Sequence, residues 1–258
     1  MLEFILEPNI LLTLCAVAFI AGFIDAIAGG GGLLTIPALL TAGLPPHLAL
    51  GTNKLAATFG SLTASITFYK KKLFKPRMWI TALATTFVGA VLGTAAVNYL
   101  DPALLDKGLP IIILATAVYT LFSRKPSEQS QAMDSNEAGF NTRQTFQGLT
   151  LGFYDGFAGP GTGAFWTVSN MALYRLNILL ASGMAKAMNF VSNATSLATF
   201  IYLGHVNWLL GVSMGVCIMA GALIGAHSAI RFGGAFIRPV FITVVIIIAA
   251  DLAWKAWF

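Results

Sequence analysis

Four charged side chains lie inside otherwise apolar stretches of this chain, and they form two similar sets. Asp25 and Lys54 belong to the first half of the sequence, and Asp155 and Lys186 belong to the second half. A charge near the centre of a membrane helix costs on the order of 2.5–3.5 kcal/mol on insertion scales, so such residues usually have a function. The lysines could hold an anion by charge. The aspartates could pair with the lysines as a structural contact, or one of them could take up a proton.

A polar stripe follows each lysine at spacings that place its members on one face of a helix. The stripe members are Thr58 and Ser61 after Lys54, and Asn189 and Asn193 after Lys186. Hydroxyl and amide groups donate hydrogen bonds, and beside a lysine they suit an oxyanion. The alternative is that each lysine is structural, with its stem along apolar surface and its ammonium group at an aspartate or at the membrane interface.

Two glycine-rich motifs precede these stripes, and each contains one of the aspartates. They read GFIDAIAGGGG (Gly22 to Gly32) and GFYDGFAGPGTG (Gly152 to Gly163). Consecutive glycines cannot form a stable helix interior, and Pro160 stops a helix in the second motif. Each break would expose backbone N–H groups at the start of the next helix, which attract anions. The expected contributors are Gly31, Gly32, Gly161, Thr162 and Gly163. The alternative is a tight turn that only lets helices pack closely.

The composition indicates that these motifs lie in a membrane. The chain is 57% hydrophobic and 10% charged, whereas soluble domains carry about 25% charged residues. Apolar runs long enough for membrane helices recur along it. They predict an all-α integral membrane protein of ten segments, at 10–28, 32–44, 47–69, 78–99, 108–123, 144–159, 163–174, 178–203, 207–230 and 236–255. The second and seventh are short, and a dozen helical residues reach only about 18 Å.

The two halves of the chain repeat each other. The first glycine motif matches the second, Lys54 matches Lys186, and GAVLG at 89–93 matches GALIG at 221–225. A polar stretch between the halves predicts a cytoplasmic linker, which divides the chain into 1–123, 124–142 and 143–258. Five segments per half is an odd number, so the second repeat should be inverted. If the short segments re-enter instead, each half has four crossings and the repeats run parallel.

The basic residues predict an orientation with the N-terminus outside, because cytoplasmic loops carry the excess of lysine and arginine. This orientation places eleven basic residues inside: Lys70, Lys71, Lys72, Lys75, Arg77, Arg124, Lys125, Arg143, Arg175, Arg231 and Arg238. Only Lys107 and Lys255 fall outside, and Lys54 and Lys186 lie within segments. The positive net charge therefore needs no nucleic-acid partner.

Several other functions find no support in the sequence. GTGAF at 161–165 lacks the Gly-Lys-Ser/Thr of a nucleotide P-loop, so we expect no ATP site. The histidines and cysteines show no metal-ligand spacing, and we expect neither a metal, nor another cofactor, nor an enzyme. Two rivals to an anion transporter remain. One is an anion channel with the same fold, and the other is a cation or metabolite transporter that uses Asp25 and Asp155 as ligands.

The segment from Gly22 to Ser65 resembles the signature region of the sulfite exporter TauE/SafE family, close to its YfcA-like branch. The first glycine motif, TIP at 35–37 and GTNK at 51–54 carry the resemblance, and GFYDGFAGPGTGAFW at 152–166 is similar to the second repeat of the family. The resemblance implies a multi-pass bacterial inner-membrane secondary transporter of small anions. Family substrates are sulfite, organosulfonates and related sulfur oxyanions, usually exported.

One departure concerns the residue next to the first lysine. GTNK places Asn53 beside Lys54, whereas the second half reads GMAK at 183–186, so this asparagine is not duplicated. We include Asn53 in the predicted anion site. The resulting expectation is alternating access of two repeats around a midplane site, with the lysines as charges and with Asp25 or Asp155 as a coupling or structural residue. Monomer and homodimer both remain open.

Overall fold

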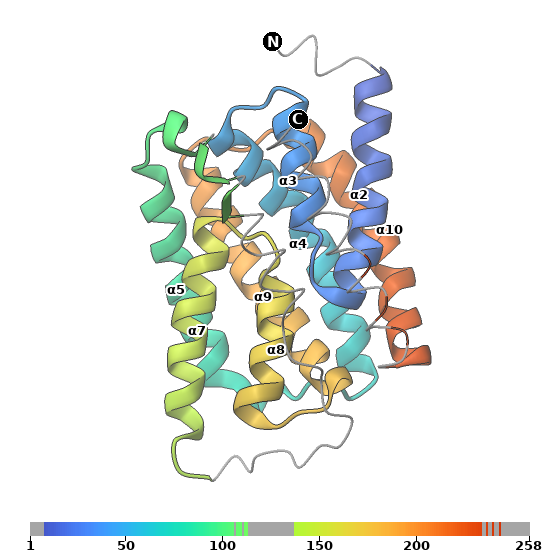
Figure 1. The fold of residues 1–258 in the computed structure, drawn as a ribbon, viewed down its shortest axis with the longest axis vertical. Helices are drawn as coiled ribbons and strands as arrows, with labels where there is room; N and C mark the ends of the chain where they lie inside the picture. The colour runs from blue at the N-terminus through green and yellow to red at the C-terminus, as the bar shows by residue number, and fades with distance from the viewer. Residues whose placement is uncertain are drawn as a thin grey trace.

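The computed structural model describes residues 8–105, 107–109, 111–112, 137–233, 236, 239 and 243. Every regular element in these ranges is a helix, in agreement with the predicted all-α fold (Figure 1). The elements are α2 (Pro8–Ala28), α3 (Gly32–Thr41), α4 (Pro46–Lys70), the 3-10 helix η1 (Pro76–Trp79), α5 (Ile80–Asn98), α7 (Phe140–Phe157), α8 (Thr162–Tyr174), α9 (Ile178–Tyr202) and α10 (Trp208–Phe232).

Eight of the ten predicted segments correspond to these helices within a few residues. The two predicted short segments are short, since α3 has 10 residues and α8 has 13. Most of the predicted segments 108–123 and 236–255 and most of the predicted linker lie outside the described residues. The count of five segments per half and the division into three parts therefore stay predictions.

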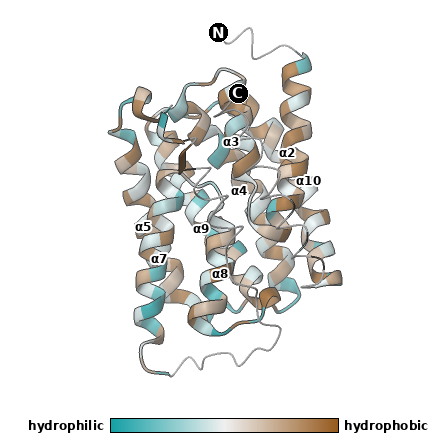
Figure 2. Ribbon diagram, viewed as in Figure 1, coloured by the Kyte–Doolittle hydropathy of each residue, from teal (hydrophilic) through white to brown (hydrophobic). Residues whose placement is uncertain are grey.

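The hydrophobic helices form the outside of the bundle. Within the described residues, three stretches are long and apolar enough to cross a membrane: Pro8–Ala28, Pro76–Asn98 and Trp208–Phe232. Hydrophobic residues predominate on α2 and α10 (Figure 2). Each of α4 and α9 has 25 residues and carries a buried polar stripe, which makes it less apolar. Large exposed side chains such as Leu12 on α2 and Ile224 on α10 suit contact with lipid.

The two halves run in opposite directions. At one end of the bundle, the start of α4 meets the loop that follows α9, where the rings of His47 and His205 stack. At the other end, Trp79 at the start of α5 packs against Phe140 at the start of α7 and Tyr174 at the end of α8. Helix α4 is therefore antiparallel to α9, which agrees with an inverted second half. Each short helix turns back toward the side from which its preceding helix came (Figure 1).

An outer helix of each half packs against a helix of the other half. Helix α2 packs parallel to α10, and α5 packs parallel to α7, so each pair joins one helix from each half. Close approach depends on glycines, because a Cβ at Gly221 of α10 would overlap the backbone of Phe19, and a Cβ at Gly93 of α5 would overlap that of Phe153. Small residues allow such contacts between membrane helices. The repeated GAVLG and GALIG sequences thus serve equivalent helix contacts.

The histidine pair at one end predicts acid sensitivity. The rings of His47 and His205 lie 5.3 Å apart, and His205 Nε2 is 3.1 Å from Asn98 Oδ1. Burial lowers the pKa of His205, and the His47 ring lowers it further. A lowered pKa means that the unfolded chain binds the proton more readily, so stability falls as pH drops below the usual value of about 6.5.

We therefore expect the midpoint of thermal unfolding in detergent to fall between about pH 7.5 and about pH 5.5, and His205→Gln to remove part of that fall. His227→Gln, at the other end of α10, is the control and should leave the fall as it is in the wild type. An equal fall in wild type and His205→Gln would show that the pair does not sense protons.

Candidate functional site

The two glycine motifs meet in the interior of the bundle. The chain leaves α2 through Gly29, at φ +81°, and leaves α7 through Gly159, at φ +87°, conformations that favour glycine. Ala164 N, in the first turn of α8, donates a hydrogen bond of 3.2 Å to Gly29 O. The break of one half is thus hydrogen-bonded to the helix start of the other half.

Each break presents the N-terminus of a short helix. At the start of α3, Gly31 N donates a hydrogen bond of 3.0 Å to Asp25 Oδ1. In the part of the chain that the structure describes, Gly32 N and Gly163 N donate no hydrogen bond. Helix N-termini carry partial positive charge, and free N–H groups there suit an anion. The role of these two glycines as anion contacts stays a prediction.

The first ion pair joins the two halves and is fully buried. Lys54 Nζ lies 2.6 Å from Asp155 Oδ1, and the two side chains are 2% and 3% exposed. Lys54 Nζ also donates to the backbone oxygen of Asp155, at 2.5 Å. The other carboxylate oxygen of Asp155 accepts a short hydrogen bond from Ser192 Oγ. Both oxygens of this carboxylate are therefore occupied.

The second ion pair is its counterpart, but it is looser. Lys186 Nζ lies 3.4 Å from Asp25 Oδ2, and the Asp25 side chain is 24% exposed whereas that of Lys186 is 1% exposed. The closer acceptor of Lys186 is the backbone oxygen of Asp25. The sequence left open whether the lysines pair with the aspartates. In the structure each lysine contacts the aspartate of the other half.

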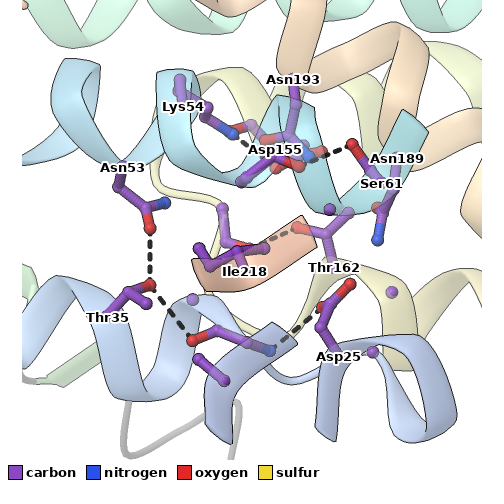
Figure 3. Close-up of a pocket in the computed structure, with 18 of the residues that line it drawn as sticks. Asp25, Thr35, Asn53, Lys54, Ser61, Asp155, Thr162, Asn189, Asn193 and Ile218 are labelled. Atoms are coloured by element: carbon purple, nitrogen blue, oxygen red, sulfur yellow. Dashed lines mark hydrogen bonds and ion pairs between the residues drawn. The ribbon is translucent and has the colours of Figure 1, made fainter. Parts of the chain in front are cut away.

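A small cavity lies where the breaks and the ion pairs meet (Figure 3). Its volume is about 40 Å³, which is room for about three water molecules. Both halves line it. The predicted site residues among its lining are Asp25, Gly31, Gly32, Asn53, Lys54, Ser61, Asp155, Gly161, Thr162, Gly163, Asn189 and Asn193.

Two predicted site residues lie apart from the cavity. Thr58 Oγ1 donates a hydrogen bond of 2.7 Å to Lys54 O, so its own helix satisfies the hydroxyl. Lys186 contacts Asp25 but is not among the lining residues. Its charge would act on a ligand through Asp25 rather than by direct contact.

The sequence reasoning missed Thr35 and Ile218 as lining residues. Thr35 Oγ1 donates a hydrogen bond of 2.5 Å to Asn53 Oδ1. The oxygen of this amide is therefore occupied, and the NH₂ group of Asn53 is the part that can donate to a ligand. Thr35 belongs to the TIP triplet, but one polar residue in a short apolar helix gives no pattern from which to infer a site. Ile218 comes from α10, and only the fold brings it to the cavity.

The amide of Asn189 lines the cavity, and its oxygen is an acceptor that calls for a hydrogen-bond donor. Asn189 is 5% exposed, and its Oδ1 has no hydrogen-bond partner among the described residues. Its Nδ2 faces Gly163, at 2.7 Å from where a Cβ of that glycine would lie. Buried polar atoms nearly always have a partner, so water or a ligand is expected beside this amide.

The cavity wall is rich in hydrogen-bond donors and has balanced charges. The two ion pairs at the cavity contain two lysines and two aspartates, so their charges sum to zero. The described residues include no group of three or more His, Cys, Asp or Glu side chains that could hold a metal. The lining hydroxyls of Ser61 and Thr162 donate to backbone oxygens, so the groups left to contact a small polar ion are amides, backbone N–H groups and a lysine.

Known proteins similar to this chain are membrane transporters by name. The model of the sulfite exporter TauE/SafE family matches residues 14–252. A probable membrane transporter protein of Haemophilus influenzae is 39% identical over 251 residues, which cover 97% of this chain and 97% of that protein. The probable membrane transporter protein YfcA of Escherichia coli is 38% identical over 253 residues, covering 98% and 93%. No solved structure matches the chain. The chain therefore belongs to the sulfite exporter TauE/SafE family of membrane transporters.

Proposed function

We propose that this chain is a secondary transporter of a small anion, with sulfite, an organosulfonate or another sulfur oxyanion as its substrate. The supporting observation is the cavity itself, in which both halves contribute amide and backbone N–H donors around Lys54. The name of the family supports this substrate class. So does the name of a relative from Arabidopsis thaliana, sulfite exporter TauE/SafE family protein 3, which is 29% identical over 106 residues.

The mechanism that we propose is alternating access. Inverted halves that share a site between two broken helices can rock around it and open it to either side in turn. The small volume of the cavity favours a site for one ion over a continuous water-filled pore. Each carboxylate in the site already contacts a lysine, which disfavours a cation as the ligand. The membrane would be the bacterial inner membrane, with the N-terminus outside.

The test is anion exchange in liposomes that contain the purified protein. Vesicles loaded with sulfite, sulfoacetate, thiosulfate or sulfate are diluted into the same anion carrying a sulfur label, and label uptake is followed. We expect saturable uptake for at least one of these anions, faster when the same anion is inside, because exchange is faster than net flux. Chloride in excess should compete poorly, since a single spherical atom lacks the separate oxygen atoms by which an oxyanion can reach donors of both halves.

Two results would contradict the proposal. No uptake of any of the four anions by folded protein would remove the sulfur oxyanion as substrate class. Uptake that does not saturate, follows the applied voltage and ignores the anion inside would identify a channel. The control for folding is the unfolding transition of the purified protein in detergent, which should be sharp.

A further inference from the structure

The two ion pairs at the cavity occupy equivalent positions in the two halves but are not equivalent in structure. Asp155 receives Lys54 on one oxygen and Ser192 on the other, and its side chain is 3% exposed. Asp25 receives Gly31 N on one oxygen, while Lys186 lies 3.4 Å from the other. Protonation of Asp155 would break a short ion pair, whereas Asp25 can accept a proton at Oδ2 with less loss.

The lysine behind Asp25 keeps a partner when that carboxylate is neutral. Lys186 Nζ is closer to the backbone oxygen of Asp25 than to its side chain. A buried ammonium that lost its only acceptor would be costly, but this one retains a carbonyl oxygen. Gly31 N can still donate to Oδ1 of a protonated Asp25, because a carboxylic acid keeps an acceptor oxygen.

The charge balance links this proton to the anion. Asp25 faces Lys186 from α9, and the cavity also holds Lys54 from α4 and Asp155 from α7. The lining residues from α3, α8 and α10 carry no charge. The sum over the four charged groups is zero, so an anion gains no net attraction from them. A proton on Asp25 changes the sum to plus one and leaves Lys186 uncompensated beside the cavity.

We propose that Asp25, not Asp155, is the proton-coupling residue, so that one proton moves together with each anion. This inference rests on the proposed anion transport. The proton adds to Asp25 Oδ2 from water on the open side, and the anion then enters a site of positive charge. Both leave on the other side, where the O–H bond breaks and the Asp25–Lys186 pair forms again. The side-chain exposure of Asp25 gives the proton its access.

The experiment follows proton and anion together in wild-type protein. Liposomes contain a pH-sensitive dye, and labelled thiosulfate is added outside without a pH gradient. Thiosulfate stays ionised over the range used, so it carries no proton of its own. We expect saturable label uptake accompanied by acidification of the lumen. Label uptake without acidification would overturn the coupling alone, whereas absence of label uptake for every sulfur anion would overturn the proposed function and the coupling with it.

Two matched variants assign the proton to one residue. Asp25→Asn mimics the neutral carboxyl group, so we expect loss of the acidification signal and exchange that no longer rises as the pH is lowered. Asp155→Asn makes the same chemical change in the other half, and its remaining exchange should still rise on acidification. Loss of the pH dependence in Asp155→Asn but not in Asp25→Asn would overturn the assignment. If one variant fails to fold, the other still decides the assignment, because a pH dependence that is kept in Asp25→Asn or lost in Asp155→Asn overturns it.

Discussion

Replacement of Lys54 by methionine is expected to abolish anion exchange and to lower the free energy of unfolding by about 3–5 kcal/mol. The side chain that remains explains the size of the effect. The Asp155 side chain is 3% exposed and would keep a buried negative charge, with Ser192 as its one side-chain donor among the described residues. Methionine has nearly the shape of the lysine stem, so packing changes little. Exchange of labelled anion in liposomes and the unfolding midpoint in detergent measure the two effects.

A double variant separates binding from stability. Lys54→Met combined with Asp155→Asn removes both charges of the pair, so most of the lost stability should return because no unpaired charge stays buried. Exchange should remain absent, since the lysine of the proposed anion site is still missing. Anion exchange at the wild-type level in the double variant would show that Lys54 is structural, and it would contradict the proposed site.

The second ion pair offers a graded comparison. Lys186→Met should cost less stability than Lys54→Met, because Asp25 is 24% exposed and keeps Gly31 N as a donor. The two changes are chemically identical and lie at equivalent positions of the two halves. A larger loss of stability for Lys186→Met would show that the Lys186–Asp25 pair contributes more than the Lys54–Asp155 pair, which would contradict this expectation.

The helices, and most of the residues that line the cavity, could be predicted from local patterns in the sequence. Glycines and a proline end α2 and α7 through the conformation of a few adjacent residues. The ends of these helices therefore do not depend on how the rest of the protein packs. The apolar runs on either side fix the helix positions for the same reason. Asp25 and Lys54 were identifiable because charge is costly in apolar surroundings, whatever contact relieves that cost.

The contacts inside the site could not be predicted in the same way. The partner of Lys54 is Asp155, and this pairing depends on how one half packs against the other. Helical spacing placed Thr58 on the same face as Lys54, but its hydroxyl bonds to the backbone of its own helix, as threonine often does. Lys186 was expected in the cavity because it matches Lys54, yet the looser Asp25 pair places it behind the wall.

The contact between the two breaks predicts opposite outcomes for adjacent glycines. Gly29 has φ +81°, and a Cβ there would overlap the backbone of Gly163. Gly30 has no left-handed conformation, and the nearest atom to its Cβ position is a flexible methyl group of Leu33 at 3.5 Å. Gly29→Ala should therefore lower the free energy of unfolding by about 2–5 kcal/mol, from backbone strain and overpacking together.

Gly30→Ala is the matched control, and it should unfold at nearly the wild-type midpoint and exchange anions. Gly163→Ala approaches the same contact from the other half, where a Cβ would lie 2.6 Å from Gly29 Cα and 2.7 Å from Asn189 Nδ2. It should lose both stability and exchange, because it displaces the amide at the cavity. If Gly29→Ala and Gly30→Ala behaved alike, the breaks would not touch, and the glycines would act only as separate turns. If Gly29→Ala and Gly163→Ala both lose anion exchange while Gly30→Ala keeps it, anion exchange requires the contact between the two breaks.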